Sequence, residues 1–170
     1  MKDNIILIDL STSGKTTIGK EVSRILEKNF IDCDNLIQEK QGKTINEIFK
    51  AYDEKYFREL EKELVDNLMG IENSVVSTGG GLPIYNNNLD KLKDVGLVIF
   101  LDAPLHEIIE RSVKVNDRPL LRGNIEKTIS KLYNERINTY KKAHYILNTE
   151  NLSIDQCANC IVNMVKQRSL

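Results

Sequence analysis

Short apolar runs alternate along the chain with segments of helical spacing. Residues 5–8 and 97–101 form nearly continuous apolar runs rich in β-branched side chains, which predicts strands buried on both faces. Shorter strands are predicted over residues 30–32, 75–77 and 145–147. Five strands are therefore expected, separated by longer connecting segments.

Those connecting segments carry apolar residues at helical offsets. Ile18, Val22 and Ile25 follow one another at spacings of four and three, which places them on one side of a helix. Further helices are predicted over residues 35–69 with breaks near Gly42 and Ala51, and over residues 86–94, from Pro104 onward, 125–143 and 154–165. The alternation predicts one α/β domain over residues 1–170 with a parallel sheet, which binds ligands beyond the carboxyl ends of its strands.

The composition narrows the class of protein. The 24 basic and 25 acidic residues nearly cancel, so the overall charge favours neither nucleic acid nor an anionic membrane as a partner. No apolar run approaches the roughly 20 residues that span a bilayer, and the first run is too short for the apolar region of a signal peptide. We therefore expect a cytoplasmic protein that binds neither nucleic acid nor a membrane.

Three cysteines are too few for a disulfide framework and fit a reducing compartment. Cys157 and Cys160 form a C-x-x-C pair, which can bind a metal or act in redox chemistry. A zinc site would need about two more ligands, and the other candidates (Cys33, His106 and His144) are scattered along the chain. We interpret the pair as small apolar residues on one side of a helix.

The segment Ser13-Gly14-Lys15-Thr16-Thr17 follows the first strand and opens a helix. Exposed N–H groups and the dipole at a helix start attract anions. Lys15 would reach the outer phosphates of a nucleotide, and the Thr16 hydroxyl would hold Mg²⁺. The phosphate-loop pattern G-x-x-x-x-G-K-[ST] is incomplete because Asp9 occupies its first glycine position. The alternative is a lysine at a helix start with threonines facing solvent.

Charged residues elsewhere suggest a second, smaller ligand. Asp32 and Asp34 follow the second strand and could serve a metal and a substrate hydroxyl, or Asp34 could cap the next helix. Arg136 lies on or beside the apolar stripe of its helix, where an unpaired guanidinium would be costly. Arg58 precedes Glu61 by three residues, so it either forms a local ion pair or binds a carboxylate or phosphate through its planar fork.

Two loops complete the candidate chemistry. Gly79, Gly80 and Gly81 follow a buried strand and allow a ligand to approach the main chain, although a flexible turn would also use glycine. The basic stretch around Arg118 could close over a polyphosphate and stabilise a transferring phosphoryl group. Its alternative is a solvated surface loop.

Taken together, these motifs resemble the shikimate kinase family, from about Asn4 to Tyr145. The matching positions are Gly14 to Thr17 with Gly19, Asp32 and Asp34, Phe57 and Arg58 with Glu61, Gly79 to Gly81, Arg118 to Leu121, and Arg136 with Tyr140 and Ala143. The resemblance implies the P-loop kinase fold, a three-layer α/β/α architecture with a five-stranded parallel sheet. It also implies Mg-ATP-dependent phosphorylation of the 3-hydroxyl of shikimate, on the pathway to chorismate and aromatic amino acids.

The resemblance also implies residue roles. Nucleotide-binding residues would be Ser11, Thr12, Ser13, Gly14, Lys15, Thr16, Thr17, Arg111 against the adenine, and Arg118 in the lid. Thr16 would hold Mg²⁺ directly and Asp32 through water. The shikimate-binding residues would be Asp34, Arg58, Gly79, Gly80, Gly81 and Arg136, with Lys15, Asp34 and Arg118 as the catalytic residues. A monomer is expected, with substrate-binding helices over about 34–62 and a basic lid over about 112–124.

Three departures from the family pattern bear on activity. Asp9 and Thr12 stand where the family has glycines, and His144 replaces a common aspartate. A carboxylate beside a polyphosphate repels it, so we expect weak nucleotide affinity unless the Asp9 side chain turns away. The alternatives are another small-metabolite kinase, such as a gluconate or nucleoside monophosphate kinase, and a nucleotide- or shikimate-binding module that has lost catalysis. The arginines and the glycine triplet favour shikimate.

Overall fold

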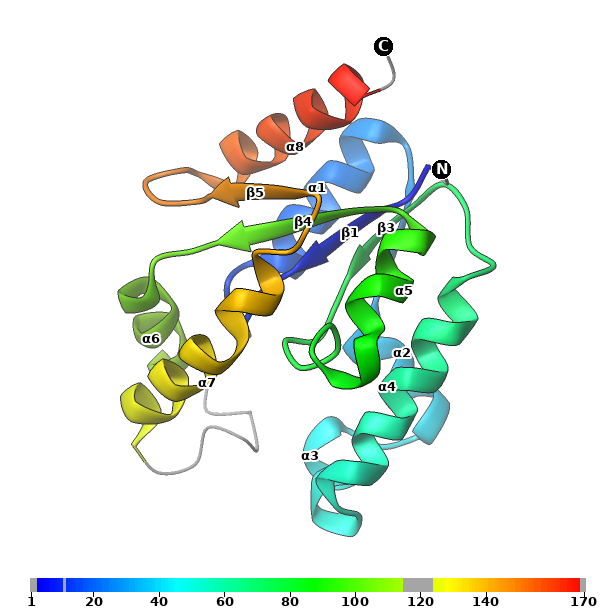
Figure 1. The fold of residues 1–170 in the computed structure, drawn as a ribbon, viewed down its shortest axis with the longest axis vertical. Helices are drawn as coiled ribbons and strands as arrows, with labels where there is room; N and C mark the ends of the chain where they lie inside the picture. Colours follow the sequence, from blue (N-terminus) through cyan, green and yellow to red (C-terminus); the bar gives the residue numbers. More distant parts are fainter. Residues whose placement is uncertain (1–2, 11, 115–123, 169–170) are drawn as a thin grey trace.

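A computed structural model describes residues 3–10, 12–114 and 124–168 of the chain. They form a five-stranded parallel sheet in the order β2-β3-β1-β4-β5, with helices on both faces (Figure 1). The strands are β1 (Ile5–Ile8), β2 (Asn29–Asp32), β3 (Ser74–Ser77), β4 (Leu97–Asp102) and β5 (Tyr145–Asn148). The helices are α1 (Lys15–Leu26), α2 (Cys33–Gln41), α3 (Ile45–Ala51), α4 (Glu54–Leu68), α5 (Asn88–Val95), α6 (Leu105–Lys114), α7 (Ile125–Tyr140) and α8 (Ile154–Arg168), with a 3₁₀ turn η1 (Tyr85–Asn87). The expected three-layer architecture is confirmed.

The central strand β1 is apolar throughout because both of its faces are covered. Ile6 and Ile8 pack in a core with α4, α5, α6 and α7, whereas Ile5 and Leu7 pack in a second core with α1 and α8. The edge strands are less enclosed, and Tyr145 and Ile146 of β5 are exposed. This difference in burial explains why the hydrophobic pattern of the sequence predicts the central strands more clearly than the edge strands.

The predicted helical stretch 35–69 is divided into α2, α3 and α4, with breaks where the sequence indicates them. Gly42 ends α2 with a φ of 59°, and Thr44 caps α3 in a reciprocal capping box with Glu47. The three helices pack around Ile37, Ile48 and Phe57. They form the lower right part of the molecule in Figure 1.

Several predicted helix boundaries differ from the structure, two of them notably. The helix expected from residue 86 begins at Asn88, because Asn86 and Asn87 have left-handed backbone with φ of 49° and 56°. The helix expected to reach residue 143 ends at Tyr140. Asparagine tolerates the left-handed region better than most residues, and helical periodicity does not register this.

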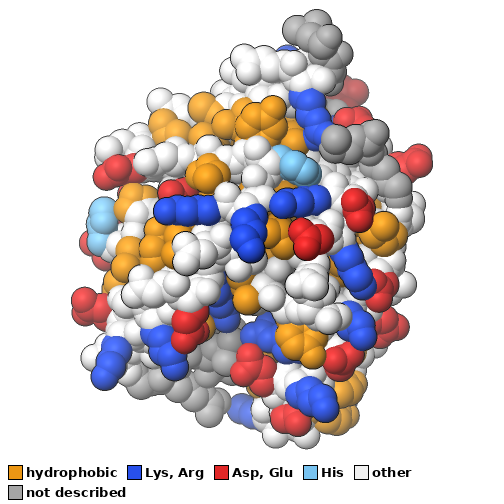
Figure 2. Space-filling model, viewed as in Figure 1, with side chains coloured by type: hydrophobic (Ala, Val, Ile, Leu, Met, Phe, Trp, Pro, Cys, Tyr) orange, Lys and Arg blue, Asp and Glu red, His pale blue; other side chains and the backbone are white. Residues whose placement is uncertain are grey.

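The surface and the cysteines agree with the sequence interpretation. Basic and acidic side chains are interspersed over the face shown in Figure 2. Cys157 is buried and Cys160 is partly buried, and both pack from α8 into the core around α1. They therefore act as small apolar residues of that helix. Among the described residues, none of the helices has the length and apolar character required to cross a bilayer.

Candidate active site

Three neighbouring strands end beside one another and carry the predicted motifs. The loop of residues 9–14 follows β1, Asp32 ends β2, and the glycine triplet of residues 79–81 follows β3. The strands are adjacent in the order β2-β3-β1 and run parallel, so these segments meet at one edge of the sheet. This is where ligands bind in parallel α/β sheets.

The loop after β1 is arranged around Lys15. Gly14 precedes α1 with a φ of 98°, a left-handed conformation that favours glycine. The Lys15 side chain is buried, and its Nζ donates to the carbonyl of Leu10 over 2.5 Å and to Oγ of Ser13 over 3.1 Å. The Lys15 ammonium therefore lies over the loop, and the alternative of a lysine at a helix start with threonines facing solvent holds for its threonines. Thr16 and Thr17, by contrast, are exposed.

Thr16 and Asp32 form an oxygen pair beside this loop. Thr16 Oγ1 donates to Asp32 Oδ2 over 2.8 Å. Asp32 Oδ1 accepts the backbone N–H groups of Asp34 and Asn35 over 3.1 and 3.2 Å, so Asp32 rather than Asp34 caps α2. The capping role considered for Asp34 is wrong, since Asp34 lies within the first turn of the helix.

This oxygen pair fits a magnesium ion. Mg²⁺ takes oxygen ligands, keeps several waters and is held by one or two protein groups together with substrate phosphates. A hydroxyl and a carboxylate oxygen 2.8 Å apart, next to Lys15, meet that description. Within the part of the chain that the structure describes, no cluster of three or more His, Cys, Asp or Glu could cage a metal, so phosphates and water would complete the coordination.

Arg58 is held between two carboxylates. Its Nη1 donates to Glu61 Oε2 over 2.6 Å, and its Nη2 and Nε donate to Glu54 Oε1 over 2.7 and 3.2 Å. The local ion pair with Glu61, one of the two alternatives for Arg58, is present. Glu61 is only 1% exposed, and burial raises the pKa of its carboxyl to about 7, with Arg58 opposing the shift. The contact with Glu54 was not predicted, although its i,i+4 spacing to Arg58 signals it.

The glycine triplet lies directly against Asp34 and Arg58. A Cβ atom added to Gly79 would lie 2.5 Å from Asp34 Oδ1, and one added to Gly81 would lie 2.1 Å from Arg58 Nη1. The carbonyl of Gly80 accepts a hydrogen bond from the Tyr140 hydroxyl over 2.6 Å. A side chain at position 79 or 81 would therefore displace the Asp34 carboxylate or the Arg58 guanidinium from its present position.

Arg136 joins the same region from α7. It is half-buried one helical turn before Tyr140. Burial raises the pKa values of Tyr140 and Glu61, and the guanidinium of Arg136 partly offsets both shifts. Arg136 thus acts on Tyr140, which bonds to Gly80, and on Glu61, which bonds to Arg58.

Asp9 is buried within the loop. It is 1% exposed, its Oδ1 accepts the N–H of Leu10 over 2.6 Å, and its Oδ2 has no hydrogen-bond partner among the described residues. Burial raises the pKa of Asp9 to about 7, and Lys15 partly offsets this shift. The expectation of weak nucleotide affinity stays a prediction.

Helix α6 borders the loop on its other side. Arg111 Nη1 donates to the carbonyl of Ser13 over 3.3 Å, and its Nη2 pairs with Glu107 over 2.5 Å. The hydroxyls of Thr12 and Ser112 lie 2.6 Å apart. Sequence reasoning missed Ser112; a polar residue four positions after Ile108, on the buried side of an amphipathic helix, was the available signal.

Two predicted site residues, Ser11 and Arg118, lie outside the described residues. The predicted lid begins inside α6, since residues 112–114 are its last turn, and Asn124 caps α7. His144 has a structural contact: its Nδ1 accepts the N–H of Val98 over 3.0 Å, just before β5.

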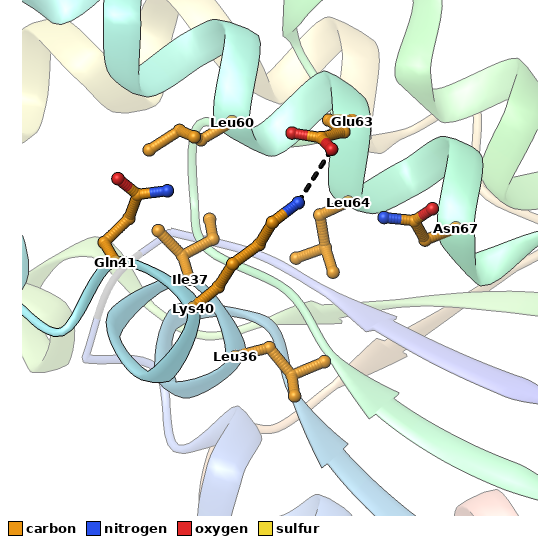
Figure 3. A pocket seen from close by; sticks show the side chains of 8 residues that line it. All are labelled: Leu36, Ile37, Lys40, Gln41, Leu60, Glu63, Leu64 and Asn67. Atoms are coloured by element: carbon orange, nitrogen blue, oxygen red, sulfur yellow. Dashed lines mark hydrogen bonds and ion pairs between the residues drawn. The ribbon is translucent and has the colours of Figure 1, made fainter.

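A small surface pocket lies between α2 and α4, and the residues that line it come from these two helices (Figure 3). Lys40 and Glu63 form an ion pair across it over 2.7 Å. Its volume of about 20 Å³ is close to that needed for one water molecule. It is therefore not a substrate site.

The sheet order, the Gly-Lys-Thr loop and the Thr16–Asp32 pair define a P-loop kinase of small molecules. A family model described as shikimate kinase matches residues 11–166, and the chain belongs to the shikimate kinase family. A shikimate kinase of Clostridium botulinum (strain 657 / Type Ba4) is 49% identical over 147 residues, covering 85% of this chain and 86% of that protein. A shikimate kinase of Sulfurihydrogenibium sp. is 40% identical over 165 residues, which cover 97% of this chain and 99% of that protein.

Solved structures agree with this assignment. Shikimate kinase from Acinetobacter baumannii in complex with shikimate superposes with a TM-score of 0.94 at 31% identity, covering 98% of this chain and 94% of that one. The shikimate kinase from Aquifex aeolicus superposes with a TM-score of 0.86 at 35% identity, with 98% of each chain covered. A gluconokinase from Sinorhizobium meliloti gives 0.60 at 13% identity, which shows a shared fold alone.

Proposed function

We propose that this protein transfers the γ-phosphoryl group of ATP to the 3-hydroxyl of shikimate, with Mg²⁺ as cofactor. Family membership supports the reaction. The observation that carries it is the packing of Asp34 and Arg58 on the glycine triplet after β3, directly beside the strand that bears the Lys15 loop. The residues proposed for the acceptor and the loop proposed for the phosphates thus lie beside the ends of neighbouring strands.

The nucleotide half of the site uses the loop and its neighbours. Lys15, the loop N–H groups and Thr17 would hold the phosphates, and Arg111, tethered to Ser13, would lie against the adenine. Thr16 and, through water, Asp32 would hold the metal, which when bound neutralises charge on the phosphates. Arg118 would add a positive charge in the transition state.

The acceptor half supplies a base and a carboxylate clamp. Asp34 would accept the proton of the 3-hydroxyl as that oxygen bonds to the γ-phosphorus and the bond from phosphorus to the ADP oxygen breaks. Arg58 and Arg136 would pair with the carboxylate of shikimate. Glu54 is 56% exposed and can leave Arg58 for solvent, whereas buried Glu61 stays and orients the guanidinium.

We also propose that the enzyme acts as a monomer in the cytoplasm, with no nucleic acid or membrane partner. Three free thiols fit a reducing compartment. The near-zero net charge gives no general attraction to polyanions.

The test is ADP release from Mg-ATP with shikimate, gluconate, nucleoside monophosphates or no acceptor. Of these acceptors, only shikimate should support release of ADP, and Lys15→Ala should abolish that release. Arg58→Ala and Arg136→Ala should raise the KM of shikimate about 30-fold or more while changing that of ATP little. Lys62→Ala, on the exposed surface of α4, is the charge-matched control.

Two results would contradict the proposal. Equal or faster turnover with another acceptor would indicate a different kinase. Binding of shikimate without ADP release at saturating Mg-ATP would indicate a binding module.

A further inference from the structure

The phosphate loop is joined to α6 at two consecutive positions. Thr12 Oγ1 lies 2.6 Å from Ser112 Oγ, and the carbonyl of Ser13 accepts from Arg111 Nη1 over 3.3 Å. Neighbouring loop residues thus bond to neighbouring residues of one helix. The next residues of the loop, Gly14 and Lys15, begin α1.

Thr12 needs such support because of its backbone. Its φ is 69°, in the left-handed region that β-branched residues rarely adopt. A strained conformation persists only where surrounding contacts hold it. The Thr12 side chain is half-buried and points to α6, where Ser112 is 1% exposed.

Both hydroxyl groups of this contact can be fully hydrogen-bonded. Thr12 Oγ1 also lies 3.4 Å from the carbonyl of Ile108 as a donor. With Ser112 donating to Thr12 and Thr12 donating to Ile108, each hydroxyl proton has an acceptor. A valine at position 12 or an alanine at position 112 would break this chain of hydrogen bonds.

We propose that Thr12 and Ser112 form a positioning pair that holds the phosphate loop in its nucleotide-binding conformation. The pair acts through the loop backbone, and it rests on the proposed function because the loop is taken to bind ATP. Loss of the bond lets the strained backbone at Thr12 relax, which displaces the N–H groups of the following residues. Nucleotide affinity then falls, whereas the chemical step in the bound complex changes little.

The test compares nucleotide binding in two backgrounds. In the wild-type background, Ser112→Ala or Thr12→Val should raise the Kd of ADP and the KM of ATP about three- to tenfold, with kcat within about twofold. Thr12→Ser keeps the hydroxyl and should retain near-wild-type affinity. In Thr12→Gly, the left-handed backbone is unstrained, so adding Ser112→Ala should change the Kd less than about twofold.

A control variant and two contrary outcomes distinguish failure of the positioning pair from failure of the proposed function. Ser23→Ala removes a buried serine hydroxyl whose bond stays within α1, and it should leave ADP affinity unchanged. An equal effect of Ser112→Ala in the wild-type and Thr12→Gly backgrounds, or no effect in either, would overturn the positioning pair. If the wild type binds no nucleotide and yields no ADP, the proposed function itself is wrong. Circular dichroism and thermal melts confirm that each variant is folded.

Discussion

Gly81 lies so close to Arg58 that a Cβ atom added to it would stand 2.1 Å from the guanidinium Nη1. The glycine therefore decides where the arginine can lie. Arg58 in turn is fixed by the buried carboxylate of Glu61 at 2.6 Å. The glycine triplet and the arginine form one unit, although the rest of α4 and the whole of β3 separate them in the sequence.

Gly81→Ala should displace the Arg58 guanidinium and raise the KM of shikimate about tenfold or more, because the added methyl group occupies its space. The KM of ATP should change little. Gly70→Ala is the matched control, since its Cβ would meet only Asn67 O at 3.9 Å. Steady-state kinetics with each substrate varied make the comparison. Unchanged shikimate kinetics in Gly81→Ala would show that Arg58 does not bind this substrate.

Glu54→Gln should lower the KM of shikimate about two- to fivefold. Glu54 pairs with the side of Arg58 that Glu61 leaves free, so its charge competes with a substrate carboxylate. The effect is small because Glu54 is 56% exposed. Glu59→Gln, on the same helix and paired with Lys62, should have no effect. A higher KM in Glu54→Gln would mean that Glu54 orients Arg58 instead of competing for it.

Asp9→Asn should change how stability depends on pH. Burial raises the pKa of Asp9 from 3.8 to about 7. The folded state thus holds this proton more tightly than the unfolded state, so the stabilisation is complete below about pH 4 and is lost as pH rises through about 7. The free energy of unfolding of the wild type, relative to Asp9→Asn, should fall between about pH 4 and 7 in urea titrations and level off above about pH 7. Parallel curves would contradict the raised pKa.

The Asp9 carboxyl should also affect nucleotide binding. Ionised Asp9 attracts Lys15 and repels phosphates, so Asp9→Asn and Asp9→Gly should bind ADP about three- to tenfold more tightly than the wild type at about pH 8. The difference should shrink at about pH 6, where Asp9 is largely neutral. Calorimetric titrations at both pH values measure it. Equal affinities at both would show that Asp9 has no influence on the phosphates.

Tyr140→Phe should lower the free energy of unfolding by about 1–2 kcal/mol. The change removes the hydroxyl that donates to the buried carbonyl of Gly80 over 2.6 Å and leaves that carbonyl unpaired. Tyr85→Phe is the control: its hydroxyl donates to Glu59 at the exposed surface, and its loss should cost less than about 0.5 kcal/mol. Urea unfolding of both variants gives the comparison, and equal losses would argue against a buried bond at Tyr140.

Much of the fold follows from the sequence. The strands 5–8 and 97–101 are recognisable because a strand covered on both faces is apolar at every position, and the helices because their buried residues recur every three or four positions. These are local patterns, so they predict the elements and the parallel sheet. They also place the Lys15 loop, Asp32 and the glycine triplet at strand ends. Hydrophobic periodicity does not show where left-handed asparagines, such as Asn86 and Asn87, delay the start of a helix.

The chemistry of single residues was decided by the tertiary structure. Nothing near Asp9 in the chain indicates that its carboxyl is buried, or that Thr12 bonds to a serine 100 positions later. The glycines at 79 and 81 indicate a close approach, but only the folded chain shows that Asp34 and Arg58 are the groups approaching. Burial, pKa and contact depend on distances between segments far apart in sequence, which local spacing does not encode.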